Sequence, residues 1–273
     1  MRSAQYEIGI IGAGNAAEGI VHGLLRNSVL LDDRIIVSNR NPEKRRLFAE
    51  RFKIAVIDDN RQVVESSFIV ILAVKPQIYR EVVAEVRELV TDEHVIVSIM
   101  AGVSTATLEA QFPQIEARVV RVMPNLPMHV GAGMAAVFPG RHARESDLLR
   151  AQRIFEASGR TVVMESEALM DAVTAVSGSG PAYFYYFVEA ITAAGQQAGL
   201  SAQQAALLAK QSCFGAARMM LESSDPPAVL RAKVTSPNGT TQAAMDTFAA
   251  NKVFEHIQEA VLAAYRRSQE LGH

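Results

Sequence analysis

The hydrophobic positions of this chain follow two spacings, and the change between them comes about three-fifths of the way along. Up to about Met164, short β-branched runs alternate with stretches of helical periodicity, whereas from Glu165 onward only helical periodicity remains. Alternation of this kind is typical of βαβ units and predicts a parallel sheet. We therefore expect an α/β domain at residues 1–164 and an all-helical domain at residues 165–273.

Several runs in the first part are expected to form strands. The later runs are closely spaced, with no room for full crossover helices, so we expect an antiparallel addition at the edge of the sheet. The expected strands are Ile8–Ile11, Ile35–Val37, Ile54–Ile57, Ile69–Val74, Val95–Ile99, Val119–Val122, Met134–Val137 and Thr161–Met164.

The C-terminal part contains recognisable helix boundaries. A helix is expected to end near Val176, Pro181 suits the first position of the next helix, and Gly199 suits its end. Ser201 followed by Gln204 predicts a capping box for a helix that runs to about residue 221. A last helix is expected from about residue 252, with one apolar stripe.

Two of these helices, at residues 182–198 and 202–220, are apolar or small around much of their circumference. Helices of this kind need burial on more than one side, and the remaining helical chain supplies few partners. We therefore expect a dimer built through this half, with a twofold axis as the commonest symmetry. The alternative is a small bundle that is self-contained.

The first expected strand leads into a glycine-rich turn. The sequence GAGNAA begins at Gly12, between the strand and an amphipathic run, and has the pattern GxGxxA. Gly12 permits a tight turn, Gly14 lets the backbone approach a pyrophosphate, and the small Ala17 lets helix and strand pack closely. This is the fingerprint of a dinucleotide-binding Rossmann domain.

The residues at the end of the second expected strand indicate which dinucleotide the domain binds. Ser38, Asn39 and Arg40 stand where an NAD enzyme typically carries Asp or Glu for the ribose 2′-hydroxyl. A hydroxyl, an amide and a guanidinium suit a 2′-phosphate instead, so NADPH is the preferred coenzyme and NADH a second one. The alternative is that Arg40 and Lys44 merely begin a solvated helix, for which the sequence NPE at 41–43 is a good start.

Composition narrows the class of protein. Lys and Arg number 27 against 29 Asp and Glu, so the formal net charge of −2 provides no global field for nucleic acid or an anionic membrane. Cys213, the single cysteine, excludes an internal disulfide framework and is compatible with a reducing cytoplasm. The six histidines show no metal-ligand spacing, so no metal is expected. Without a targeting pattern, or the ~20 apolar residues that span a bilayer, we expect a soluble, cytoplasmic protein.

Three further strand exits are candidates for ligand contact, because open α/β sheets bind ligands at the carboxyl ends of their strands. Pro76 turns the chain away after the fourth strand and leaves the backbone of Ala73–Lys75 near the crevice. Ala101 and Gly102 follow the fifth strand and let a flat ring approach, and RVMPN follows the sixth from Arg121. Each exit alone is explained as an ordinary strand end. Three such exits after consecutive strands favour a ligand-binding site.

A turn rich in hydroxyl and amide groups, VTSPNGTT from Val234, separates two helical stretches near the C-terminus. Pro237 fixes φ, Asn238 and Gly239 tolerate left-handed backbone, and the two threonines then open a helix whose first N–H groups lack intrahelical partners. Such a place binds a carboxylate or phosphate. The alternative is an ordinary helix cap.

The ordered motifs resemble those of the pyrroline-5-carboxylate reductase family over nearly the whole chain. The resemblance implies an NAD(P)H-dependent reductase of the last step of proline synthesis, with a Rossmann domain and a helical dimerisation domain. It also implies an active site shared between protomers and dimers that often assemble further, to decamers in many members. The motifs are GAGNAAEG from Gly12, AVKPQ from Ala73, AGV from Ala101, RVMPN from Arg121, SGSGPAYFY from Ser177 and VTSPNGTT from Val234.

The chain departs from the family pattern at two positions. Asn238 stands where the family usually has glycine, and because Asn also tolerates left-handed φ we expect the turn to survive. Ala16 stands where many relatives carry Met, a packing change with little bearing on chemistry.

The resemblance also implies roles for individual residues. Backbone N–H groups and the Ser236 hydroxyl are expected to hold the substrate carboxylate, with Thr241 as the catalytic residue near the ring nitrogen, while Asn60 matches a position that contacts the adenosine ribose. The implied substrate-binding residues are Ser236, Asn238, Gly239, Thr240 and Thr241. The implied coenzyme-binding residues are Gly12, Gly14, Asn15, Ala16, Ser38, Asn39, Arg40, Asn60, Ala73, Val74, Lys75, Pro76, Ala101, Gly102 and Asn125.

The chemistry of a cyclic imine agrees with this residue set. The protein must mainly orient the imine and the coenzyme and handle one proton, and a hydroxyl such as that of Thr241 can hold the nitrogen or relay that proton. Two alternatives stay open. One is a six-membered cyclic imino acid as substrate, since one methylene discriminates by only ~1–3 kcal/mol. The other is a non-catalytic, NADP-binding regulatory protein.

Overall fold

The computed structural model describes residues 4–271, which form two compact units. Within the described chain, the first unit runs to Ser179 and also contains the C-terminal end from Ala264 onward. The second unit is Gly180–Ala263.

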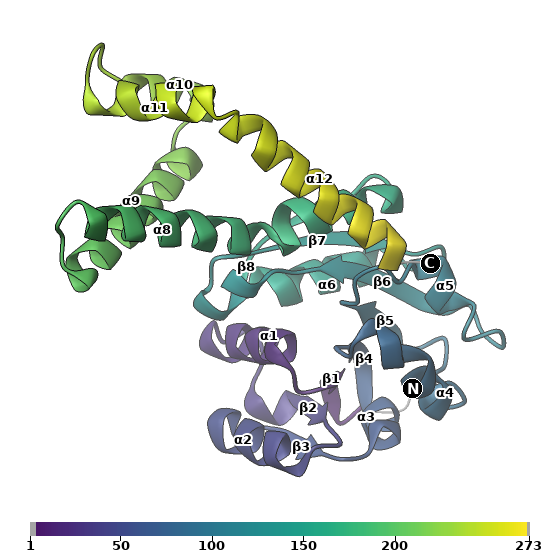
Figure 1. The fold of residues 1–273 in the computed structure, drawn as a ribbon. Helices are drawn as coiled ribbons and strands as arrows, with labels where there is room; N and C mark the ends of the chain where they lie inside the picture. Colours follow the sequence, from purple (N-terminus) through teal and green to yellow (C-terminus); the bar gives the residue numbers. More distant parts are fainter. Residues whose placement is uncertain (1–3, 272–273) are drawn as a thin grey trace. The chain divides into compact units, whose positions relative to one another are not determined.

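The first unit is built on an eight-stranded sheet, and every strand overlaps one of the expected runs. The strands are β1 Tyr6–Ile11, β2 Ile35–Ser38, β3 Ala55–Ile57, β4 Ser67–Leu72, β5 Val95–Ser98, β6 Arg118–Met123, β7 Gly133–Pro139 and β8 Gly159–Val163. Their order is β3-β2-β1-β4-β5-β6-β7-β8, and the first six strands in this order are parallel (Figure 1). This is the strand order of a Rossmann domain, so the expected fold class is confirmed.

Helices connect these strands and make up the second unit. They are α1 Asn15–Arg26, α2 Pro42–Phe52, α3 Asn60–Ser66, α4 Tyr79–Val86, α5 Thr105–Glu109, α6 Glu145–Glu156, α7 Met170–Val173, α8 Gly180–Gln197, α9 Ala202–Glu222, α10 Pro227–Lys233, α11 Thr240–Ala250 and α12 Val253–Leu271. A 3₁₀ turn at Glu167–Leu169 precedes α7, and a π-helical turn at Thr174–Gly178 follows it.

The far edge of the sheet confirms one expectation and corrects another. Strand β7 is antiparallel to β6, as expected, but β8 is parallel to β7. Parallel neighbours need a crossover, and α6, with 12 residues, provides it. The expectation that this part has no room for a full crossover helix is therefore wrong. Helix α6 buries Ala151, Ile154 and Phe155, and Leu148 packs against the same core, while its remaining positions are polar or exposed.

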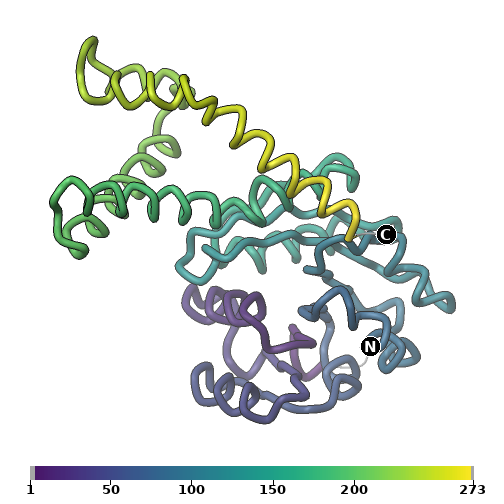
Figure 2. The backbone as a smooth tube through the Cα atoms, in the orientation of Figure 1, coloured from purple at the N-terminus to yellow at the C-terminus, as the bar shows by residue number. Residues whose placement is uncertain are grey.

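Both faces of the sheet are buried, because the crossover helices between parallel strands cover them. Ile10 and Ile71 belong to the core cluster that includes residues of α1, α2 and α6. Their neighbours Ile11 and Leu72 belong to the cluster that includes residues of α3, α4 and α5. Successive strand residues point to opposite faces, so strands that are apolar throughout fill both layers. The path of the chain through these strands and crossovers can be followed in Figure 2.

The helices of the second unit have the expected boundaries. Gly199 has a φ of 99° after the end of α8, and Ser201 and Gln204 form the capping box that begins α9. Helices α8 and α9 pack closely where Gly195 faces Ala205, which is buried. Short side chains at this contact let the two backbones approach.

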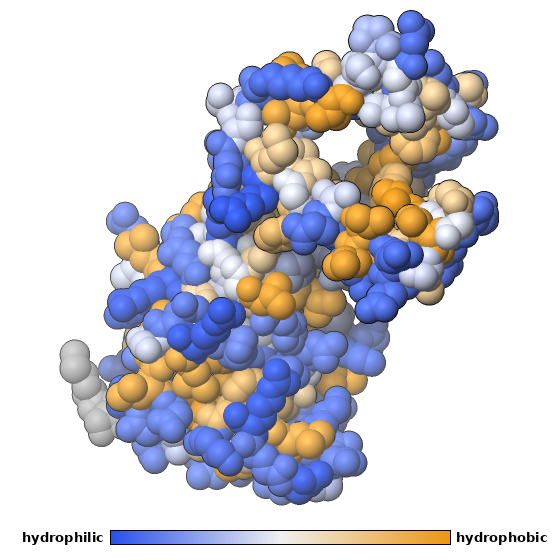
Figure 3. Space-filling model, turned by 90° about the vertical axis from the view of Figure 1, so that its left-hand side faces the viewer, coloured by the Kyte–Doolittle hydropathy of each residue, from blue (hydrophilic) through white to orange (hydrophobic). Residues whose placement is uncertain are grey.

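Many large apolar side chains of the second unit are nevertheless exposed in the single chain. Figure 3 shows apolar side chains at the surface in its upper part, where the helical unit lies. An apolar surface of this extent is typical of an interface with another copy. The exposed side chains on α8, α9, α11 and α12 include Phe184, Tyr186, Ile191, Leu207, Leu208, Phe214, Met219, Phe248, Phe254 and Leu262.

No helix within residues 4–271 combines the length and the apolar character that crossing a bilayer requires.

Candidate active site

The carboxyl ends of β1, β2 and β4 are joined by backbone hydrogen bonds at the point where the strand order reverses. The N–H of Gly12 donates to the carbonyl of Ser38 at 2.9 Å, and the N–H of Ala73 donates to the carbonyl of Ile11 at 2.9 Å. Gly12 has a φ of 111°, and a Cβ atom on it would lie 2.5 Å from the carbonyl oxygen of Ala73. Only glycine fits this turn, which sits where Rossmann domains bind dinucleotides.

Gly14, in contrast, has an ordinary backbone conformation and faces open space. Its backbone is extended, with φ −99° and ψ −178°, and it is the N-cap of α1. A Cβ atom on Gly14 would have no described atom within 4 Å. This open space lies directly before the first N–H groups of α1, at Asn15 and Ala16, while Ala17 packs in the core. A pyrophosphate fits such a helix N-terminus.

The side chains at the end of β2 form a chain of hydrogen bonds. Ser38 is fully buried, and its hydroxyl donates to Oδ1 of Asn60 at 2.7 Å. The Nδ2 of Asn60 donates to Oε2 of Glu85 at 2.9 Å. Ser38 therefore lies beneath the surface and contacts Asn60, the first residue of α3, which is also buried.

Arg40 is held by two carboxylates of α4. Its Nη1 donates to Oε1 of Glu81 at 2.7 Å, and its Nη2 donates to Oε2 of Glu85 at 3.4 Å. These two carboxylates raise the pKa of the Arg40 guanidinium, and Glu81 contributes most. The sequence contains no local signal for this contact, because the partners are 41 and 45 residues apart and the order of the strands brings them together.

A second arginine holds the turn that carries Arg40. The Nη1 of Arg45 donates to the carbonyls of Asn39 and Arg40, at 2.9 and 3.0 Å, and its Nη2 pairs with Asp58 at 3.3 Å. Asn41 caps α2 by accepting from the N–H groups of the first turn, so a helix does begin where the sequence NPE predicts it. Arg40 precedes this helix, and its side chain extends towards α4 instead.

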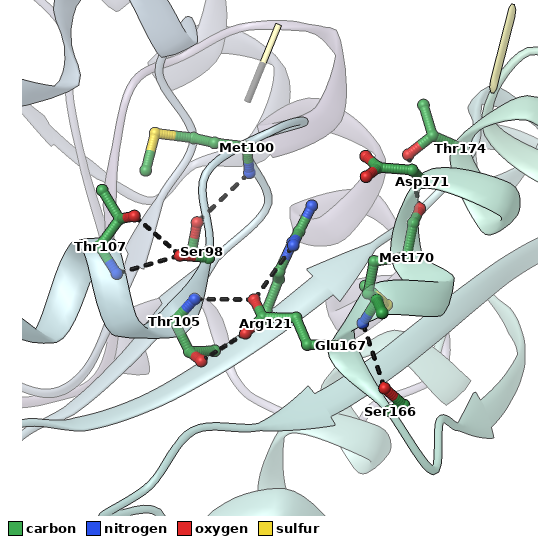
Figure 4. Close-up of polar contacts among 12 residues, drawn as sticks. Ser98, Met100, Thr105, Thr107, Arg121, Ser166, Glu167, Met170, Asp171 and Thr174 are labelled. Atoms are coloured by element: carbon green, nitrogen blue, oxygen red, sulfur yellow. Dashed lines mark hydrogen bonds and ion pairs between the residues drawn. The ribbon is translucent and has the colours of Figure 1, made fainter. Parts of the chain in front are cut away.

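Glu167 links the start of α5 to β6, and we did not identify it from the sequence. Its two carboxylate oxygens each accept a hydrogen bond of 2.7 Å from Thr105, one from the N–H and one from the hydroxyl. Oε1 also accepts from the buried Arg121 at 3.0 Å, and Figure 4 shows Glu167 between these two partners. Ala101 and Gly102 lie in the loop that ends at Thr105, so Glu167 fixes the end of that loop to β6.

Asn125 contacts protein groups with both ends of its amide. Its Nδ2 donates to the carbonyl and to the hydroxyl of Ser177, at 3.2 Å each, and its Oδ1 accepts from the N–H of Met134 at 2.9 Å. Ser177 lies in the π-helical turn, a form of helix that often marks functional sites. Asn125 thus positions the SGSG segment against β7.

Replacing Asn125 with alanine is expected to lower the free energy of unfolding by about 1–3 kcal/mol, because the N–H of Met134 and the carbonyl of Ser177 lose their partner. Chemical denaturation measures this change. Asn27→Ala is the matched control, because Asn27 donates to the carbonyls of Gly23 and Ala157 at 3.2 and 2.8 Å. If Asn125 also serves coenzyme binding, only Asn125→Ala weakens the affinity for NADPH; equal NADPH affinity in the two variants would limit Asn125 to a structural role.

The VTSPNGTT segment folds as a turn followed by a helix start, as expected. The N–H of Gly239 donates to the carbonyl of Ser236 at 3.0 Å, and Asn238 has a φ of 60°. Proline followed by a residue of positive φ defines a type II turn, so the expected turn forms with Asn238. Gly239 itself has a φ of −85°, and a Cβ on it would lie 2.3 Å from the Ser236 Oγ. The Ser236 hydroxyl therefore lies at the start of α11.

The first turn of α11 is open to a ligand. Gly239 is its N-cap, and no side chain of the described residues caps it. Its first N–H groups, from Thr240 and Thr241, have the partial positive charge of a helix N-terminus. Thr241 is half-buried and Thr240 is exposed. The substrate-binding residues expected from the sequence thus lie together in the second unit, and the expected coenzyme-binding residues lie in the first.

Two family descriptions match this chain. Residues 167–271 match the family model described as “Pyrroline-5-carboxylate reductase dimerisation”. Residues 7–102 match the family model described as “NADP oxidoreductase coenzyme F420-dependent”. The chain is 40% identical to the pyrroline-5-carboxylate reductase of Pseudomonas aeruginosa, over 97% of this chain and 96% of that protein.

Solved structures agree. A pyrroline-5-carboxylate reductase from Coxiella burnetii has a TM-score of 0.90 and 35% identity, and the match covers 98% of this chain and 99% of that one. A Plasmodium falciparum pyrroline carboxylate reductase with NADP bound has a TM-score of 0.89 and 26% identity, with 99% of each chain covered.

With this sheet order and the glycine fingerprint at its reversal point, the chain is an NAD(P)-dependent oxidoreductase. The similarity to pyrroline-5-carboxylate reductases over nearly the whole length identifies the family within this class. The chain belongs to the pyrroline-5-carboxylate reductase family, and its C-terminal helices form that family's dimerisation domain. The exposed apolar side chains of α8 and α9 lie within this dimerisation domain.

Proposed function

We propose that this chain reduces L-1-pyrroline-5-carboxylate to L-proline, the last step of proline biosynthesis, with NADPH as the preferred reductant and NADH as a second. The observation that carries the proposal is the type II turn that opens α11. It offers the N–H groups of Thr240 and Thr241 and the Ser236 hydroxyl to a carboxylate, and Asn238 and Gly239 give the turn its shape. A small cyclic imino acid carries that carboxylate next to its reacting ring.

The first unit fits a dinucleotide. The open space at Gly14 and the N-terminus of α1, at Asn15 and Ala16, suit the pyrophosphate, and Arg40 with Asn39 suits a 2′-phosphate. Asn60 suits the ribose, and the strand exits are proposed to border the nicotinamide. When bound, the reduced coenzyme supplies the hydride. The residues proposed at the strand exits are Ala73, Val74, Lys75, Pro76, Ala101, Gly102 and Asn125.

Thr241 is proposed to act on the imine nitrogen. Elsewhere in this helix a threonine hydroxyl is used by the backbone: Thr247 donates to the carbonyl of Ala243, four residues earlier, at 2.9 Å. Thr241 lies in the first turn, and the residue four positions earlier, Pro237, precedes the helix. We propose that this hydroxyl holds the nitrogen and relays its proton.

The assembly is proposed to be a homodimer through the C-terminal helices, with further association of dimers up to a decamer. The dimerisation match and the exposed apolar side chains of the second unit support the dimer. We also propose that the protein works in the cytoplasm, that residues 1–164 serve coenzyme binding and that residues 165–273 serve dimerisation and substrate binding.

Coenzyme oxidation, followed by the near-ultraviolet absorbance of NADPH, tests the function directly. We expect rapid turnover with pyrroline-5-carboxylate, slower turnover with NADH, and weaker activity on the six-membered imine, because one methylene changes discrimination by about 1–3 kcal/mol. Faster turnover of the six-membered ring would reassign the substrate. No coenzyme oxidation with either imine, in a protein that still binds NADPH, would contradict catalysis and favour a regulatory role.

A further inference from the structure

The carboxylates beside Arg40 bear on the choice between the two coenzymes. NAD-binding Rossmann domains place an acid at the end of the second strand, where it holds the ribose 2′-hydroxyl. In this chain β2 ends without one, yet Glu81 and Glu85 of α4 reach the side chain that follows β2. The end of β2 therefore has no acid in its own sequence, but the tertiary structure places two acids from α4 beside it.

Two carboxylates compete with a 2′-phosphate for Arg40. One guanidinium, that of Arg40, faces two carboxylates, so the group carries an excess of one negative charge. Two further cations lie nearby: Arg45 is paired with Asp58, and the Nη1 of Arg61 donates to the backbone carbonyl of Glu85 at 3.1 Å. A phosphate that binds Arg40 must share the guanidinium with Glu81 and Glu85 and must lie close to both negative charges.

The two glutamates differ in what else they hold. Glu85 is the less exposed, and its Oε2 also accepts from Asn60, which in turn holds the buried Ser38. Glu85 is therefore part of the hydrogen-bonded framework at the end of β2. Glu81 has a side chain that is 63% exposed, and its contact with Arg40 is the shorter of the two ion pairs. Removing the charge of Glu81 alters the surroundings of Arg40 and leaves the framework in place.

We propose that Glu81 is a coenzyme-selectivity residue: through its ion pair with Arg40 it weakens the binding of NADPH and thereby keeps NADH in use. This inference rests on the proposed function, because it assumes that Arg40 faces the 2′-phosphate. Arg40 then favours NADPH less than it would without Glu81, and the preference between coenzymes is set by the balance of three charged side chains.

The test is a titration of the full-length protein with NADPH and with NADH, followed by nicotinamide fluorescence, for wild type and for Glu81→Gln. The expected result is a Kd for NADPH about threefold to tenfold lower in Glu81→Gln, with the Kd for NADH changed by less than about twofold, since only NADPH brings a phosphate to this place. The unchanged affinity for NADH also shows that the variant is folded.

Glu88→Gln is the matched control, because it removes the same charge from a nearby residue that pairs with Arg87 at 3.3 Å. An NADPH affinity that is equal in Glu81→Gln and wild type, or raised as much by Glu88→Gln, would overturn the proposal. So would an Arg40→Gln variant that binds NADPH as wild type does. The titration needs no imine, so failure to reduce pyrroline-5-carboxylate would count against the proposed function alone, whereas a wild-type protein that binds neither coenzyme would overturn both.

Discussion

Thr241→Ala is expected to lower kcat with pyrroline-5-carboxylate by about 100-fold, the lower end of what a positioned proton-transfer group contributes. The variant loses the hydroxyl that we place at the ring nitrogen and keeps the backbone N–H groups that we place at the carboxylate. The effect should therefore appear in kcat more than in KM for the imine, and the Kd for NADPH should not change. Steady-state kinetics and a coenzyme titration measure the three quantities.

Two companion variants make this result specific. Thr241→Ser keeps a hydroxyl at the same position and should recover most of the activity. Thr247→Ala removes a hydroxyl from the same helix, where it donates to the carbonyl of Ala243, and should leave turnover unchanged. If Thr241→Ala bound NADPH normally and turned over as fast as wild type, Thr241 would have no role in the reaction.

Alanine substitutions of the two fingerprint glycines are expected to have different effects, one on stability and the other on coenzyme affinity. Gly12→Ala places a Cβ 2.5 Å from a backbone oxygen at a φ of 111°, so the free energy of unfolding should fall by roughly 2–5 kcal/mol. Gly14→Ala adds a methyl to open space on an extended backbone, and stability should change by less than about 1 kcal/mol. Its affinity for NADPH should nevertheless fall by at least about tenfold, because the methyl occupies the approach to the pyrophosphate.

Thermal and chemical denaturation of the two variants, beside NADPH titrations, separates these effects. The expected pattern is a destabilised Gly12→Ala and a stable Gly14→Ala that binds the coenzyme poorly. A Gly14→Ala variant with wild-type affinity would show that the pyrophosphate does not approach this glycine. A Gly12→Ala variant as stable as wild type would show that the turn can rearrange.

Local patterns were sufficient to predict the strands and several helix boundaries. Runs of β-branched residues overlap all the strands of the sheet, and the capping box at Ser201 and Gln204 formed as predicted. The turn at Asn238 also followed from residue type, because asparagine accepts a positive φ. The crossover helix α6 was missed because its apolar face is confined to a few positions and most of its residues are polar or exposed.

Contacts between distant segments could not be predicted in the same way. Glu167 reaches Thr105 across 62 positions of sequence, and Asn125 reaches Ser177 across 52. Glutamate and asparagine at these places carry no periodic or spacing signal of their own. The roles that they acquire come from the strand order and from the turns that follow the strands.

The sequence by itself determined the class of fold, the dinucleotide fingerprint at Gly12 and Gly14 and the type II turn at Asn238, because each depends on a few consecutive residues and their backbone preferences. The tertiary structure alone decided which charges surround Arg40. A side chain at the end of β2 meets α4 only when β4 packs against β1 and carries the next helix to that edge. Periodicity is a local property, whereas an ion pair between elements depends on the topology of the whole sheet.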